Sequence, residues 1–207
     1  LFSDIKKIFI DFFSFKKNYF KENKMLGIKI IIATLPALLF GFLIYEFFLI
    51  YLRDLVVIGW ASIIFGCLLY FADQRYSSKK KWEELNMYEI LIIGFFQVLA
   101  FIPGASRSGV TITAARFLNI KRNEAAIFSM LLSIPIITAS LCLAVFDLLI
   151  VNQHTFSLIQ PLISTIIAFI TAIISIHIMM KIISSSNFNI FIIYRIIFGI
   201  TLLVFYA

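Results

Sequence analysis

The chain has 207 residues, of which 62% are hydrophobic and only 14% charged, with a formal net charge of +7. A typical soluble domain has about 45–50% apolar and about 25% charged residues, so a water-soluble fold of this length could not cover its apolar surface. Disorder is excluded as well, because the chain has too much apolar surface to leave in water. Long Ile, Leu and Phe stretches between short charged loops predict an all-α, polytopic helical membrane protein, with residues 1–207 forming a single integral-membrane domain.

Five stretches are long enough to cross a bilayer of about 30 Å, which requires roughly 20 mostly apolar residues. We place them at 28–45, 55–72, 125–147, 159–181 and 190–206. The Lys-rich segment 1–27 precedes the first of them and is amphipathic, which predicts a helix on the membrane surface.

The positive charge lies in the loops between apolar stretches and forms no stripe, so it favours the positive-inside rule over nucleic-acid binding. Residues 1–29 hold seven of the 18 Lys and Arg, whereas the loops at 46–54 and 148–158 hold only Arg53. The basic side is therefore predicted to be cytoplasmic. This orientation requires that the segment 88–120 enter and leave the membrane on the same side.

The segment 88–120 has two apolar arms that are too short to span a bilayer. The first, from Ile90 to Ile102, would form a helix of about 20 Å, and the second, from about Val110 to Leu118, is shorter. A Pro-Gly-Ala-Ser-Arg-Ser-Gly break separates them. These lengths predict a re-entrant hairpin of two half-helices, and irregular backbone at membrane depth survives only where it lines a protein cavity.

Arg107 lies in this break, where a guanidinium near the membrane midplane needs an anionic or carbonyl partner. Three hydroxyls and two glycines surround it in the sequence, namely Ser106, Ser108, Thr111, Gly104 and Gly109. Free N–H groups and the positive dipole end of the second half-helix attract anions, and a guanidinium binds phosphate oxygens in a forked geometry. The break therefore predicts a phosphate or diphosphate site inside the membrane.

Other interpretations of these residues remain open at this level. Pro103 and Gly104 could simply kink a helix, with Arg107 paired to an acid elsewhere; a Walker A loop is excluded because no Gly-Lys-Ser/Thr occurs at the required spacing. Gln97 precedes the break and could bond either to the backbone or to a ligand. Arg195 lies near the inner end of the last span, where we expect it to extend toward the interface rather than bind substrate.

Residues 103–111 resemble the PGxSRSGxT signature of bacterial undecaprenyl-diphosphate phosphatases of the bacitracin-resistance family. The similarity includes Gly94 and Gln97 upstream, the stretch 122–135 downstream, and Tyr194-Arg195. It is close over about 88–135 and looser over the rest of the chain. The signature is long and rarely met elsewhere, so the resemblance is specific.

The resemblance implies two interlocked inverted repeats, each with a re-entrant hairpin, in the bacterial inner membrane, with the pocket open to the periplasmic side. It also implies hydrolysis of the phosphoric anhydride of a C55 polyprenyl diphosphate to the monophosphate and inorganic phosphate. That reaction recycles the lipid carrier of peptidoglycan synthesis and underlies bacitracin resistance. Arg107, Ser106 and Thr111 would be catalytic. The expected substrate-binding residues are Gly104, Ser108, Gly109 and Gln97.

The family's other hairpin motif, QGxTEFLPxSSSGH, is absent from residues 1–207. By resemblance that motif supplies acids, a Ser, a His and the ligands of a divalent cation, Mg or Ca, so we assign no metal ligand here. Because the chain opens on Leu1, we expect a truncated N-terminus and no activity from this chain alone. The expected partners are the polyprenyl diphosphate, membrane lipids and a second copy in a homodimer, without nucleic acid.

A polyprenyl-phosphate transporter or flippase is the alternative function, since transporters also use broken half-helices at the midplane. A phosphatase requires acidic residues facing Arg107, whereas a transporter requires ligands for a coupling ion.

Overall fold

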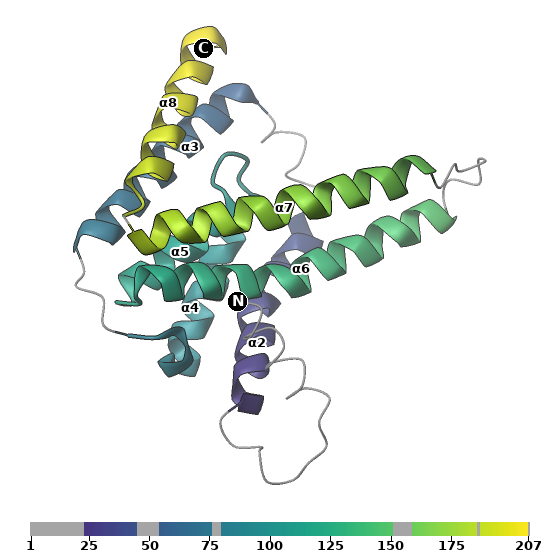
Figure 1. Cartoon of the computed structure of the whole chain (residues 1–207), viewed down its shortest axis with the longest axis horizontal. Coiled ribbons are helices and arrows are strands. Elements are labelled where there is room, and N and C mark those ends of the chain that lie inside the picture. The colour runs from purple at the N-terminus through teal and green to yellow at the C-terminus, as the bar shows by residue number, and fades with distance from the viewer. Residues whose placement is uncertain (1–22, 45–53, 76–79, 151–158, 186, 207) are drawn as a thin grey trace.

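The computed structural model describes residues 23–44, 54–75, 80–150, 159–185 and 187–206 (Figure 1). Its α-helices are α2 (Asn23–Ile44), α3 (Leu55–Arg75), α4 (Met87–Val98), α5 (Arg107–Phe117), α6 (Arg122–Ile150), α7 (Ile159–Ser185) and α8 (Asn189–Tyr206), with short 3-10 helices η1 (Trp82–Glu84) and η2 (Leu99–Phe101). Within these ranges no strand forms, so the predicted all-α class is confirmed. The surface helix predicted within 1–27 lies almost wholly outside the described residues.

Among the described residues, four helices are long and apolar enough to cross a membrane, at Leu55–Gln74, Arg122–Phe146, Gln160–Ser184 and Asn189–Tyr206. They confirm four of the five predicted spans and make the chain a multi-pass membrane protein. The fifth predicted span, 28–45, is helical within α2, but its apolar part in the described residues, Gly27–Gly41, is shorter than a full span. Large apolar side chains remain exposed along α6, α7 and α8, as expected for surfaces that face lipid.

The segment 88–120 forms a helical hairpin in which α4 and η2 lead to a turn at 102–106 and α5 returns. The two open ends of the hairpin, which we call its feet, are bonded to each other. The Lys80 N–H donates to the Asn119 carbonyl at 3.2 Å, and the Lys121 N–H donates to the Lys80 carbonyl at 3.0 Å. The hairpin therefore starts and ends on one side of the molecule, as the charge distribution required. Its insertion into the membrane, the inverted repeat and the single-domain boundary stay predictions.

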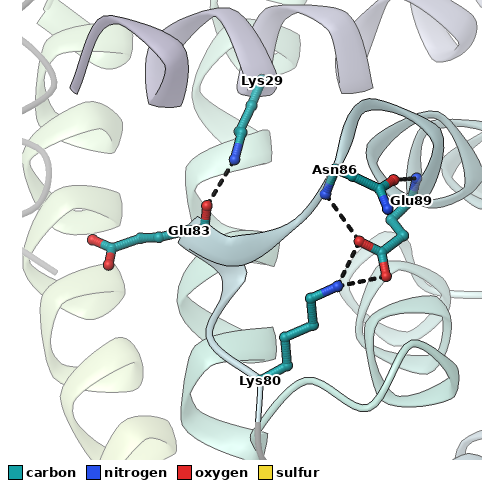
Figure 2. Close-up of polar contacts among 5 residues, drawn as sticks. All are labelled: Lys29, Lys80, Glu83, Asn86 and Glu89. Carbon is teal, nitrogen blue, oxygen red and sulfur yellow. Dashed lines mark hydrogen bonds and ion pairs between the residues drawn. The ribbon is translucent and has the colours of Figure 1, made fainter. Parts of the chain in front are cut away.

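Polar contacts hold the first foot of the hairpin in place (Figure 2). The Asn86 side chain accepts from the Glu89 N–H, and the Glu89 carboxylate accepts from the Asn86 N–H, both at 2.9 Å, which is a capping box at the start of α4. The Lys80 ammonium donates to the same carboxylate at 2.6 Å. Lys29 of α2 donates to the Glu83 carbonyl at 2.7 Å. The start of the hairpin is thus bonded to α2 through Lys29 and to Lys80, whose backbone in turn bonds to Asn119 and Lys121 at the end of the hairpin.

Helices α3 and α8 pack at backbone distance and lie side by side in Figure 1. A Cβ atom on Gly199 would lie 2.7 Å from the Gly59 carbonyl oxygen, so a larger residue there would force the helices apart. Small residues at such interfaces allow the close approach that stabilises helix pairs in membranes.

Helix α5 is the most enclosed helix of the described chain. It contacts α3, α4 and α6, and every residue from Gly109 to Arg116 is buried. Its first two residues, Arg107 and Ser108, are more accessible, and both belong to the predicted site.

Candidate active site

The hairpin turn adopts backbone conformations that side chains seldom allow. Gly104 has φ of +90°, and a Cβ atom there would lie 2.4 Å from the Ile58 carbonyl oxygen, so only glycine fits. Ser106 also has a positive φ, 63°, although it carries a side chain. Strained residues of this kind persist where the surrounding structure holds them, and they cluster at functional sites.

The start of α5 presents two hydroxyls beside its N-terminal N–H groups. The Ser106 hydroxyl accepts from the Gly109 N–H at 3.3 Å, so Ser106 is the N-cap, and it lies 3.4 Å from the Ser108 hydroxyl. Both serines are exposed. The first N–H groups of a helix have no partner within it and, together with the dipole, favour an anion at this end.

A cavity of about 370 Å³ lies against this end of α5, within the usual size range of small-molecule sites. Its polar lining is Ser62, Gly104, Ser106, Ser108, Gly109 and Arg195. Its apolar and aromatic lining is Leu69, Ile112, Met179, Ile183, Phe188, Phe191, Tyr194 and Phe198, contributed by α3, α5, α7, α8 and the residue before α8. A cavity that is polar at the hairpin turn and apolar elsewhere suits an amphiphilic ligand.

Arg195 of α8 points into the hairpin turn, so the prediction that it extends toward the interface is wrong. One of its terminal nitrogens, Nη2, donates to the carbonyls of Gly104 and Ala105, each at 2.7 Å. The other, Nη1, is buried without a hydrogen-bond partner in the described chain, and a Cβ on Gly109 would lie 2.6 Å from it. The only signals for this residue in the sequence were a charge within an apolar helix and the Tyr-Arg match to the family.

Arg107 is the first residue of α5 and is half-buried. Its Nη1 atom is buried and has no hydrogen-bond partner among the described residues. Arg107 and Arg195 likewise form no ion pair with an acid in that part of the chain. The alternative in which Arg107 pairs structurally with an acid therefore finds no such acid there, and neither arginine has a counter-anion in the described chain.

Thr111 and Gln97 lie behind the turn, away from the residues that border the cavity. Thr111 is 2% exposed, and its hydroxyl lies 3.0 Å from the Arg107 carbonyl and 2.7 Å from the Ser129 hydroxyl of α6. Gln97 is 1% exposed, and its amide atoms have no partner in the described chain. The structure thus brings together Gly104, Ser106, Ser108, Gly109 and Arg195 around the cavity, whereas Arg107 directly follows the turn but is not among the residues that line the cavity.

The model of the bacitracin resistance protein family, BacA, matches residues 1–201. The chain belongs to this family. The undecaprenyl-diphosphatase of Jannaschia sp. (strain CCS1) is 40% identical over 181 residues, which cover 86% of this chain and 67% of that protein. The undecaprenyl-diphosphatase of Saccharophagus degradans is 40% identical over 178 residues, covering 86% of this chain and 66% of that protein. The undecaprenyl-diphosphatase of Aliivibrio salmonicida is 41% identical over 197 residues, covering 93% of this chain and 71% of that protein.

These matches confirm the predicted resemblance to the bacitracin-resistance family. The names of the relatives support the predicted phosphatase activity and not the transporter alternative. The chain spans about two thirds of the length of these BacA relatives.

We expect Thr111 to affect catalysis indirectly, by holding the backbone of the first turn of α5 in place. A threonine hydroxyl has one proton, which here goes to a carbonyl of the preceding turn, Arg107 or Ser108, so Ser129 donates to Thr111. We expect Thr111→Val and Ser129→Ala each to lower kcat about tenfold, because the first turn of α5 loses its tie to α6. Thr111→Ser should retain most activity. Phosphate-release assays on the purified variants measure this.

Thr113→Val provides the matched control, because within the described chain this buried threonine donates only to the Gly109 carbonyl of its own helix, at 2.7 Å. It should change kcat less than about threefold. If Ser129→Ala left kcat unchanged while Thr111→Val abolished activity, Thr111 would be a direct substrate ligand instead.

The divalent cation implied by the BacA resemblance has no ligand set in the described residues. No three His, Cys, Asp or Glu side chains lie close enough there to hold a metal ion.

Proposed function

We propose that the protein hydrolyses undecaprenyl diphosphate to undecaprenyl phosphate and inorganic phosphate. The observation that carries the proposal is the arginine pair at the hairpin tip: Arg195 bonds to the turn, Arg107 begins the helix that follows it, and each has a buried Nη1 without a hydrogen-bond partner in the described chain. A diphosphate supplies the missing anion, and the apolar wall of the adjoining cavity suits the isoprenoid units next to it.

In this reaction water attacks the terminal phosphorus, the bond from phosphorus to the bridging oxygen breaks, and the lipid monophosphate leaves. Negative charge spreads over the transferred phosphoryl group and the leaving oxygen, so positioned donors do most of the catalytic work. The unpartnered Nη1 atoms of both arginines and the first N–H groups of α5 are such donors. Ser106 and Ser108 add hydroxyl donors that border the cavity.

The proposal includes a divalent cation, Mg or Ca, whose ligands lie outside the described residues. It places the protein in the bacterial plasma membrane as a homodimer. The hairpin feet, which carry Lys80 and Lys121, would lie on the cytoplasmic side, and the turn with Arg107 would face the outer side. Light scattering of the detergent-solubilised protein tests the homodimer.

Phosphate release from farnesyl diphosphate in detergent tests the activity. We expect release by the protein expressed from its complete reading frame, none by residues 1–207 alone, and loss of release when a chelator removes divalent cations. Release from residues 1–207 would show that they contain the whole site. A complete protein that binds labelled polyprenyl diphosphate but releases no phosphate would contradict the proposal and favour a lipid transporter.

A further inference from the structure

A buried carboxylate ties three helices together at the end of the hairpin opposite the turn. Asp73, near the end of α3, has a fully buried side chain. Its Oδ1 atom lies 2.9 Å from Nε of Arg116 in α5 and 2.8 Å from Nε of Arg122 in α6. The Arg116 guanidinium also donates to the carbonyls of Asp73 at 2.9 Å and of Ile120 at 2.7 Å. Helix α5 is therefore pinned axially to α3 at its C-terminal end.

Stability alone is a poor reason for this arrangement. The Arg116 side chain is only 2% exposed, and the desolvation of a buried ion pair usually offsets most of its electrostatic attraction. Buried ionic groups are best attested as devices that select one register among several packings. Arg116 lies nine residues after Arg107 on an uninterrupted helix, so an axial shift at Arg116 moves Arg107 by the same distance.

Helix α3 is also the element that positions the other guanidinium of the site. Helix α8, which carries Arg195, packs against α3 at backbone distance where Gly59 meets Gly199. Near the hairpin turn, the Ser62 hydroxyl of α3 donates to the Gly104 carbonyl at 3.4 Å. Helix α3 thus contacts the helix that carries Arg195, the hairpin turn and the C-terminal end of α5, and so fixes their relative positions.

We propose that Asp73 and Arg116 are positioning residues that set the register of α5 on α3, and thereby hold Arg107 and Ser108 at the distance from Arg195 that binds a diphosphate. The proposal rests on the proposed function for the identity of the ligand. Neither residue borders the cavity, so each acts through the helix to which it belongs.

Arg122 offers a matched control within the same cluster. It pairs with the same Asp73 oxygen as Arg116, but it begins α6 and its side chain is 36% exposed. Losing Arg122 removes an ion pair from Asp73 and leaves the link between α3 and α5 intact. Losing Arg116 removes that link.

The experiment compares Arg116→Met, Arg116→Lys and Arg122→Met in the protein expressed from its complete reading frame. The thermal midpoint, kcat and KM with farnesyl diphosphate, and Kd for its non-hydrolysable methylene analogue are measured well below the lowest midpoint. We expect Arg116→Met to lower kcat/KM by about ten- to a hundredfold and to weaken analogue binding, with partial rescue by Arg116→Lys. Arg122→Met should stay within about threefold of the unmodified protein.

Equal losses in Arg116→Met and Arg122→Met would overturn the proposal, as would an Arg116→Met protein with a lower thermal midpoint but unchanged kcat/KM. Asp73→Glu keeps every charge and lengthens the carboxylate arm by one methylene, so it covers the case in which Arg116→Met does not fold. We expect Asp73→Glu to lower kcat/KM at least about tenfold, and full activity would overturn the proposal.

The two proposals fail separately. If the unmodified protein binds the analogue but releases no phosphate, the proposed function falls, and the ratio of Kd values between Arg116→Met and Arg122→Met decides the positioning role. If it neither binds nor hydrolyses, both proposals fall.

Discussion

Arg107→Met is expected to lower kcat for phosphate release by about 10³-fold or more. The guanidinium stands at the first position of α5 with a buried, unpartnered Nη1, so within the described chain it has no structural hydrogen bond to lose. In the proposed reaction it meets charge that develops on the phosphoryl group, and arginines with that role contribute about 10³–10⁵ to kcat. Arg107→Lys keeps the positive charge but not the forked pair of donors, so it should lower kcat roughly 10- to 100-fold.

Stability separates this role from a structural one. Removing a half-buried guanidinium whose buried Nη1 has no partner in the described chain relieves a desolvation penalty, so the thermal midpoint of Arg107→Met should be unchanged or raised. Lys121→Met is the matched control, since Lys121 is an exposed basic residue at the foot of the hairpin and should leave kcat unchanged. An Arg107→Met protein that keeps more than about a tenth of the original kcat would contradict the catalytic role.

Arg195→Met is expected to lower kcat/KM by about 10²–10³-fold and also to destabilise the protein. It removes an Nη1 donor beside Gly109 and two hydrogen bonds of 2.7 Å to the carbonyls of Gly104 and Ala105. Hydrogen bonds to charged groups contribute about 1.5–3 kcal/mol each, so a lower thermal midpoint should accompany the loss of activity.

Arg195→Lys distinguishes the two contributions. An ammonium can still donate to the two carbonyls, so most of the stability should return, whereas the second donor toward Gly109 is lost and activity should stay low. Steady-state kinetics and thermal unfolding of both variants measure this. If Arg195→Lys had full activity and stability, Arg195 would need only its charge, as a residue that extends toward the interface does.

The sequence by itself determined the elements whose signals are local in the chain. The arm predicted from Ile90 to Ile102 corresponds to α4 and η2, and the second arm corresponds to α5. Helix length follows from the run of apolar residues, and the break follows from Pro103 and Gly104, because these effects act between neighbours along the backbone. The predicted grouping of Gly104, Ser106, Ser108 and Gly109 held for the same reason, since a turn and the N-terminus of a helix bring close neighbours together.

Only the tertiary structure decided which distant residues join the turn and which neighbours face away from it. Arg195 donates to the carbonyl of Gly104, 91 positions earlier in the chain, and Asp73 of α3 pairs with Arg116 of α5. The Thr111 hydroxyl contacts Ser129 and does not line the cavity. Helices in a membrane are apolar on almost every side, so their sequences carry little information about which face meets which neighbour. The turn that we propose binds an anion consists of consecutive residues, whereas the position of Arg195 and the register of α5 depend on how separate helices pack against α3.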